Sequence, residues 1–382
     1  MSTTTLADTI ESMPLVDHHV HSVLREPLAE SDFLDALTEA AGAFARETAF
    51  DSQLGFAVRR HCAPLLGLEP FASGEDYLAA RTEIGFEEAT RRFLRASGIS
   101  TYLIDGGYLP ETLLGEAELM QLADAVSHSI VRLESVAEAA MTGASSAVAF
   151  RERLSTSLDE HARTAIGYKT VAAYRCGLDL DPERPDEASV AAAAASWFDD
   201  VATGAPVRLV DPVLIRHLIW WALERKAVVQ IHAGFGGPTL MLTTANPAHM
   251  QRFLAATQDT GGRIVFLHCY PYVREAGFMA HLYPHVYLDA GLTINYLGAN
   301  AAVAVRETLE LAPFNKVLFS SDAWGLPELV YLGARLWRDA TLSVLQSYVD
   351  RDGWPVGEAA RIAELVASRN AEELYSHQFA GD

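Results

Sequence analysis

Eight short runs of apolar and β-branched residues are spread along the chain, and segments with helical spacing separate them. A strand followed by a helix, repeated in this way, is the pattern of βαβ units, which build a parallel sheet. Eight such units close into a (β/α)8 TIM barrel, whose functional site lies where the strands end. We therefore predict an α/β barrel formed by a single domain over residues 1–382. The predicted strands span residues 15–21, 100–105, 130–134, 166–172, 228–232, 264–268, 286–289 and 317–322.

A long stretch separates the first two predicted strands. From about residue 31 to residue 96 the sequence has helical character, with Phe33, Leu34 and Leu37 at helical spacing. We therefore predict a helical insertion after strand one. Two interpretations of it stay open: a cap over the barrel mouth that shields or shapes the site, or a peripheral helical unit that packs beside the barrel.

Net charge and composition indicate which kinds of molecule the protein can bind and in which compartment it acts. The formal net charge of −21 argues against nucleic acid and anionic membrane surfaces, because both favour a basic protein face. No secretory signal pattern is visible, and no apolar run reaches the roughly 20 residues that a spanning helix needs. Cys62, Cys176 and Cys269 form no CxxC motif, which fits a reducing compartment. We expect a cytoplasmic protein that acts on a small molecule, with a homodimer as the default assembly.

The first predicted strand ends in the sequence Asp17-His18-His19-Val20-His21. Side chains alternate between the two faces of a strand, so Asp17, His19 and His21 are predicted to share one face and His18 to take the other. Two imidazoles that converge in this way are suited to bind one divalent metal ion. A polar strand end with satisfied histidines explains this motif equally well when it is taken alone.

Other predicted strands also end in groups that bind metals. His232 ends the fifth run, His268 ends the sixth, and Asp322 ends the eighth. Each of them alone is commonly a hydrogen-bonded structural residue or a helix cap. Together they place ionisable groups at one rim of the barrel, and such groups are costly to bury unless they are paired or bound to metal. The rim is therefore a predicted metal site.

Lys169 lies inside the fourth apolar run, where an ammonium group is expensive to bury. Either it pairs with a carboxylate, or its pKa is lowered so that the neutral amine reacts with carbon dioxide. The resulting carbamate would be an anionic ligand able to bridge two cations. Both readings stay open from the residues alone.

Residues just beyond the strand ends are candidates for binding substrate. Arg175 follows the fourth run, where its guanidinium is suited to bind a substrate carboxylate, although a salt bridge accounts for it equally well. Tyr174 and Trp324 are predicted to line the pocket, with packing as the alternative. The glycine-rich segment 234–238 lacks phosphate-loop spacing and predicts only a close approach of the backbone to substrate.

These features resemble the amidohydrolase superfamily, and within it the amidohydrolase-related (amidohydrolase 2) group. The likeness covers nearly the whole chain and is strongest to the amidohydrolase-like domain of FluG-type proteins, because of segments 167–170 (GYKT) and 173–178 (AYRCGL). The resemblance implies that His19, His21 and Asp322 bind one metal. It also implies that His232 and His268 bind a second metal and that a carboxylated Lys169 bridges the two.

The resemblance implies hydrolysis of a C–N bond, with one or two divalent ions, zinc by expectation, activating water. Asp322 and His268 are the expected catalytic residues, with Asp322 as the general base. The expected substrate is a small carboxylate-bearing amide, such as a γ-glutamyl or N-acyl compound. The alternatives are a single-zinc non-oxidative decarboxylase, a hydro-lyase or sugar-acid isomerase, and a non-catalytic metal-binding module. The number of metal ions per chain separates the decarboxylase from the hydrolase.

Overall fold

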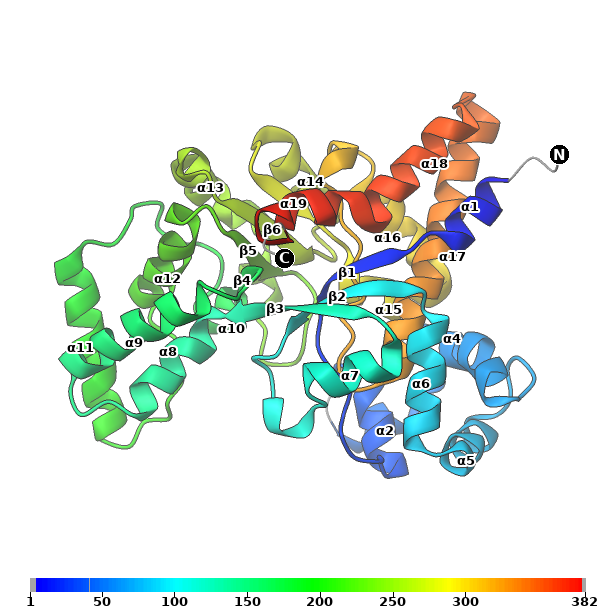
Figure 1. Cartoon of the computed structure of the whole chain (residues 1–382), viewed down its shortest axis with the longest axis horizontal. Coiled ribbons are helices and arrows are strands. Elements are labelled where there is room, and N and C mark those ends of the chain that lie inside the picture. The colour runs from blue at the N-terminus through cyan, green and yellow to red at the C-terminus, as the bar shows by residue number, and fades with distance from the viewer. Residues whose placement is uncertain (1–4, 41, 380–382) are drawn as a thin grey trace.

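A parallel sheet organises the fold in a computed structural model, which describes residues 5–40 and 42–379 (Figure 1). Neighbouring strands in the sheet follow the order of the chain, and every pair is parallel. The strands are β1 (Leu15–Val20), β2 (Ile99–Asp105), β3 (Val126–Arg132), β4 (Gly167–Thr170), β5 (Val228–Ala233), β6 (Arg263–His268) and β7 (Val286–Leu288). The predicted α/β class is confirmed, with strands at seven of the eight predicted positions.

The eighth predicted strand is not formed as a strand in the described residues, although its segment lies between β7 and β1. The Leu318 N–H donates to the Leu288 carbonyl at 3.0 Å, and the Asp322 N–H donates to the His19 carbonyl at 3.1 Å. The regular ladder is broken because the Ser321 N–H donates to the Asp17 carboxylate instead of a backbone carbonyl. Asp322 also has φ 47°, which is incompatible with extended backbone.

Side chains from six of the strands, from Ile166 just before β4 and from Leu318 enclose an apolar interior below the strand ends. Tyr375, from the C-terminal helix, packs into this cluster. The cluster contains Val16, Leu103, Ile130, Ile166, Val228, Val265, Leu267, Leu318, Ala371, Leu374 and Tyr375, with Tyr287 packed against it. Because one end of the interior is filled in this way, ligands can approach only from the carboxyl ends of the strands.

Helices cover the outside of the sheet, as the pattern of alternating strands and helices predicts (Figure 1). None of the described helices is long and apolar enough to cross a bilayer. The helices outside the insertion are α1 (Leu6–Ser12), α7 (Glu116–Ala123), α8 (Leu133–Thr142), α9 (Ala147–His161), α10 (Ala172–Arg175), α11 (Glu187–Ala202), α12 (Pro212–Glu224), α13 (Gln251–Thr257), α14 (Val273–Leu282), α15 (Gly291–Leu297), α16 (Ala301–Thr308), α17 (Pro327–Asp352), α18 (Val356–Glu364) and α19 (Asn370–Phe379).

Strand β1 contains an irregularity that changes which side chains face the interior. Asp17 pairs with Tyr102 and Val20 pairs with Ile104, so β1 uses three steps where β2 uses two. The extra residue is a bulge, and it interrupts the alternation of faces. His18 and His19 consequently both contact Gln230 in the interior, while Asp17 turns toward Ser321. The predicted common face of Asp17 and His19, with His18 opposite, is therefore wrong.

Five α-helices of the described residues lie between β1 and β2 and gather beside α7 and α17 (Figure 1). They are α2 (Glu30–Ala36), α3 (Ala43–Glu47), α4 (Gln53–Ala57), α5 (Gly74–Ile84) and α6 (Phe86–Ala96). Glu328 of α17 is fully buried and ties α5 to the barrel. Its carboxylate accepts hydrogen bonds from Arg81 Nε at 2.6 Å and from Tyr77 Oη at 3.1 Å.

Replacing Arg81 with Met is expected to destabilise the protein by about 3–5 kcal/mol, because the buried Glu328 carboxylate then lacks its counter-ion. Chemical denaturation followed by circular dichroism measures this change. The double variant Arg81→Met/Glu328→Gln should recover much of the loss, since both charges are then removed. An equal loss in the single and double variants would contradict this account of the pair.

Candidate active site

A cavity of about 720 Å³ opens at the carboxyl ends of the strands. All the site residues predicted from the sequence line it except His19, which lies fully buried. The predicted residues on its wall are His21, Lys169, Tyr174, Arg175, His232, His268, Asp322 and Trp324. Residues separated by up to 300 positions are thus brought to one cavity.

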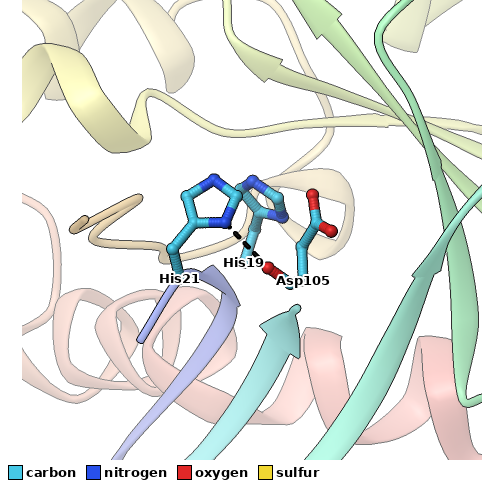
Figure 2. Close-up of side chains that lie close together, drawn as sticks. All are labelled: His19, His21 and Asp105. Carbon is cyan, nitrogen blue, oxygen red and sulfur yellow. Dashed lines mark hydrogen bonds between the residues drawn. The ribbon is translucent and has the colours of Figure 1, made fainter. Parts of the chain in front are cut away.

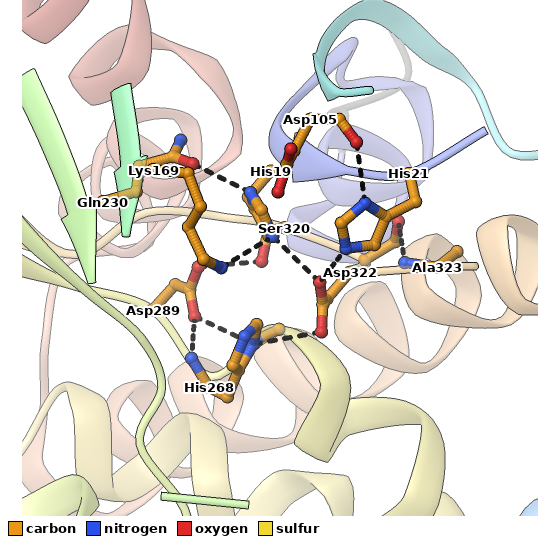
Figure 3. A network of polar contacts seen from close by, with 12 residues as sticks. His19, His21, Asp105, Lys169, Gln230, His268, Asp289, Ser320, Asp322 and Ala323 are labelled. Atoms are coloured by element: carbon orange, nitrogen blue, oxygen red, sulfur yellow. Dashed lines mark hydrogen bonds and ion pairs between the residues drawn. The ribbon is translucent and has the colours of Figure 1, made fainter. Parts of the chain in front are cut away.

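The Asp322 carboxylate is surrounded by three histidines (Figure 3). Its Oδ1 lies 3.0 Å from His19 Nε2 and 3.7 Å from His21 Nε2, and its Oδ2 lies 3.3 Å from His268 Nδ1. Burial raises the pKa of Asp322 well above its usual range, which the ammonium group of Lys169 opposes. A buried carboxylate beside imidazole nitrogens is suited to accept a proton or to bind a metal ion.

Hydrogen bonds orient the imidazole rings of His19 and His21. Gln230 Nε2 donates to the His18 carbonyl at 2.7 Å, which turns Gln230 Oε1 toward His19. His19 Nδ1 then donates to Gln230 Oε1 at 2.8 Å, and His21 Nδ1 donates to the Asp105 carbonyl at 2.8 Å (Figures 2 and 3). With Nδ1 protonated, each ring directs its Nε2 lone pair toward Asp322, as metal-binding histidines do.

Lys169 reaches this cluster from β4 through the interior. Its Nζ lies 3.2 Å from His19 Nε2, and the side chain is almost fully buried. Burial lowers the pKa of Lys169 to about 8, although Asp322 and Asp105 oppose that shift. A substantial fraction of the amine is therefore neutral near physiological pH, which is the form that can react with carbon dioxide.

The residues present fit a bound divalent metal. His232 Nε2, His268 Nδ1 and Asp322 Oδ1 are buried and have no hydrogen-bond partner among the described residues. Ligand atoms of His19, His268 and Asp322 all lie within 4.8 Å of one another. The rings of His232 and His268 are 4.5 Å apart, and burial lowers the pKa of both, which keeps them neutral and able to coordinate. Imidazole nitrogen with carboxylate oxygen is a donor set typical of zinc.

Asp105, at the end of β2, forms a second compact group with His19 and His21 (Figure 2). Its carboxylate is already engaged, because Oδ2 accepts from Arg132 Nη2 at 2.5 Å and Oδ1 accepts from the Gly107 N–H. Burial alone would raise the pKa of Asp105, but Arg132 lowers it to about 2. Asp105 therefore orients His21, and Asp322 is the better placed metal ligand.

Sequence reasoning missed the roles of Asp105 and Asp289, although both end predicted strands. Asp289 Oδ2 binds His18 Nε2 at 2.7 Å and accepts from Ser320 Oγ at 2.8 Å, while its Oδ1 accepts from the His268 N–H at 2.7 Å. Asp289 thus positions a histidine of the site. The signal was available, since a carboxylate that ends an apolar run was the criterion that selected Asp322.

Left-handed backbone occurs at two of the residues that form the site. His268 has φ 66° and Asp322 has φ 47°, and Cys269 beside His268 has φ 62°. Non-glycine residues adopt this region at an energetic cost and are concentrated at functional sites. The turn at each strand end therefore directs the side chain into the cavity.

The predicted substrate-binding residues lie on the cavity wall with partners of their own. Arg175 Nη1 forms an ion pair with Glu138 at 2.8 Å, and Tyr174 Oη accepts from the Gly237 N–H at 2.9 Å. Trp324 packs edge-on against Tyr108 at 5.7 Å, and its Nε1 has no hydrogen-bond partner among the described residues. The structure places all three side chains at the cavity.

Gly236 lies where no side chain fits. A Cβ there would lie 2.0 Å from Tyr174 Oη and 2.9 Å from His232 Nε2. Gly236→Ala is therefore expected to displace both rings and to lower kcat/KM by about 100-fold or more, since small misplacements of site groups have effects of this size. Steady-state kinetics measure the loss. Gly106→Ala is the matched control, because its Cβ would meet nothing within 4 Å; equal activity of the two variants would contradict the assignment.

Known proteins share both the sequence pattern and this architecture. The amidohydrolase family model matches residues 125–376. Protein fluG of Emericella nidulans is 28% identical over 96% of the chain, which spans 46% of that protein's length. A crystal structure of a candidate metal-dependent hydrolase from Lactobacillus casei, 25% identical, superposes with a TM-score of 0.85, and each chain is covered completely.

The fold is also similar to that of a uronate isomerase from Bacillus halodurans, at 13% identity and a TM-score of 0.62, with 97% of this chain and 95% of that chain covered. At this identity the likeness concerns the fold alone. The family model covers most of the sheet and four of the predicted metal ligands, Lys169, His232, His268 and Asp322. The chain therefore belongs to the amidohydrolase family.

Proposed function

We propose that this protein is a metal-dependent hydrolase that cleaves the C–N bond of a small, carboxylate-bearing amide. The observation that carries the proposal is the contact of one buried carboxylate, Asp322, with His19, His21 and His268 at the cavity. Membership of the amidohydrolase family supports the hydrolase class.

The proposed metal ligands form two groups, with a carboxylated Lys169 shared between them. His19, His21 and Asp322 would hold one divalent ion, most suitably zinc, and His232 with His268 would hold a second. The lowered pKa of Lys169, to about 8, supports its carboxylation, and the carbamate would bridge the two positions. A bound ion would supply Lewis acidity, polarising the scissile carbonyl and lowering the pKa of water toward neutrality.

Asp322 is the proposed general base. Its carboxylate takes the proton from the attacking water and passes it to the leaving nitrogen. The water oxygen bonds to the carbonyl carbon and the C–N bond breaks, so the products are a carboxylic acid and an amine. His268, whose Nδ1 lies 3.3 Å from Asp322 Oδ2, would act beside that carboxylate as a metal ligand.

Arginines on the cavity wall support a substrate that carries a carboxylate. Arg132, Arg175 and Arg208 all line the cavity, and Arg208 is exposed with no ion-pair partner among the described residues. These cations support a small carboxylate-bearing amide as the substrate, and γ-glutamyl and N-acyl compounds are the proposed classes. The insertion acts as a cap in this proposal, because its residue Glu39 forms part of the cavity wall.

Metal removal tests the proposal directly. The protein is stripped with a chelator, reconstituted with zinc, and assayed for amine release from a panel of N-acyl amino acids and γ-glutamyl amides. We expect no amine release from the stripped protein and recovery with metal. Failure of any divalent ion to copurify or rebind would overturn the metal site. Release of carbon dioxide without amine by the metal-loaded protein would favour the decarboxylase instead.

A further inference from the structure

Glu39 is a carboxylate that the insertion contributes to the cavity. It lies in the connection between α2 and α3, half-buried, on the same wall as Tyr174 and Tyr296. Tyr296 Oη donates to Glu39 Oε1 across 3.5 Å, which is a long hydrogen bond. A Cβ on Gly237 would lie only 3.2 Å from Glu39 Oε2, so the glycine allows the carboxylate to approach the loop after β5.

No cation within the described part of the chain neutralises Glu39. Among the described residues, none of the lysines, arginines or histidines forms an ion pair with it, and the charged group that acts on it from the metal cluster is the like-charged Asp322. Burial raises the pKa of Glu39, which reflects the cost of removing this charge from water without a counter-ion. A positively charged group in the cavity would remove that cost.

Two tyrosines line the same cavity as Glu39. Tyr174 and Tyr296 line the cavity beside Glu39, and the ring of Tyr296 is supported by Phe235 at a centroid distance of 5.1 Å. A carboxylate together with aromatic faces is a set suited to an ammonium group, since the ring quadrupole also attracts cations. An anionic ligand group would instead be repelled by Glu39 and Asp322.

The three arginines that line the cavity differ in whether a carboxylate of the protein forms an ion pair with them. Arg132 is bound to Asp105 and Arg175 to Glu138, so their charges are matched within the protein. Arg208 has no such partner among the described residues and is exposed on the cavity wall. Outside the cluster of proposed metal ligands, the described cavity residues therefore include an unmatched anion, Glu39, and an unmatched cation, Arg208.

We propose that Glu39 and Tyr296 form an ammonium subsite, so that the substrate is zwitterionic, with an amine at Glu39 and a carboxylate at Arg208. This inference deepens the proposed function and rests on it for the amide that is cleaved. An amino acid linked through its side-chain carboxyl to a leaving amine has this arrangement of charges. The insertion then determines specificity, because it supplies the group that recognises the amine.

Binding of two simple probes tests the subsite independently of turnover. Glutamate and glutarate differ only in the ammonium group, and calorimetry on the zinc-reconstituted protein measures both affinities. We expect wild type to bind glutamate about tenfold or more tightly than glutarate, the effect of one partly buried charged hydrogen bond. Glu39→Gln should remove this preference and Tyr296→Phe should weaken it. Glu30→Gln, which removes an exposed charge from α2 of the same insertion, should leave it intact.

Turnover of γ-glutamyl and glutaryl p-nitroanilide tests the ammonium subsite and the hydrolase activity separately. We expect Glu39→Gln to lower kcat/KM about tenfold for the γ-glutamyl compound and to leave the glutaryl compound nearly unchanged. Equal binding of glutamate and glutarate by wild type, no binding of either, or a preference that survives in Glu39→Gln would overturn the subsite. A glutamate preference with no cleavage of any amide would keep the subsite and overturn the hydrolase. Equal cleavage of both anilides in all variants would keep the hydrolase and overturn the subsite.

Discussion

Replacing Asp322 with Asn is expected to lower kcat/KM by about 10² to 10⁴-fold, the contribution typical of a positioned general base. The amide has the same size and keeps one oxygen for a metal, but it cannot accept the proton of the attacking water. Because asparagine has the same shape as aspartate, we expect the packing of the three histidines within 3.7 Å of Asp322 to be kept. The loss should therefore appear in kcat, with the divalent metal content and the fold retained.

The measurement combines steady-state kinetics on the amide found by the substrate panel with metal analysis of the purified variant. Asp199→Asn is the matched control, since it removes an exposed carboxylate on α11 away from the cavity. Full activity of Asp322→Asn would eliminate Asp322 as the base. Loss of metal together with activity would assign it a ligand role and leave the base unidentified.

Replacing Lys169 with Met is expected to reduce the metal content from two ions per chain to one and to lower kcat/KM by at least about 100-fold. Methionine fills the same buried space beside His19 but cannot form a carbamate. Reconstitution of wild type should depend on bicarbonate, because the neutral amine and carbon dioxide together generate the bridging ligand. The lowered pKa of Lys169, to about 8, makes that reaction accessible and more favourable as the pH rises toward 8.

Metal analysis after reconstitution with and without bicarbonate tests this expectation, and carbon NMR with labelled bicarbonate identifies a carbamate that the variant lacks. Lys226→Met, at an exposed position away from the cavity, is the control. One ion per chain in wild type, unchanged in Lys169→Met, would show that Lys169 is an ion-paired residue. That outcome would favour the single-zinc decarboxylase over the hydrolase.

The parallel sheet could be predicted from the sequence because strands buried on both faces are continuous apolar runs. The cavity position of His232, His268 and Asp322 followed from the same reasoning, since parallel strands deliver their last residues to one rim. The eighth strand was predicted from an equally apolar run, but the Asp17 carboxylate occupies the Ser321 N–H that a ladder would use. That contact joins residues 304 positions apart and has no local signal.

The orientation of the histidines in β1 could not be predicted for a related reason. Alternation assumes an unbroken register, whereas the bulge between Asp17 and Val20 depends on how β1 pairs with β2. The contacts of Arg175 and Glu39 likewise could not be predicted from their neighbours in the sequence. Glu138 reaches Arg175 from α8, and the insertion brings Glu39 against the loop that contains Gly237.

By itself, the sequence determined the alternation of strands and helices and the residue types that end each strand, because hydrophobic periodicity acts between near neighbours in the chain. Long-range contacts instead pair His18 with Asp289 and Asp105 with Arg132, and they leave Glu39 without a counter-ion among the described residues. These features depend on hydrogen-bond register and on charges supplied from distant elements. The physical reason is that pairing energies in a buried site are set by the groups brought into contact, whatever their separation along the chain.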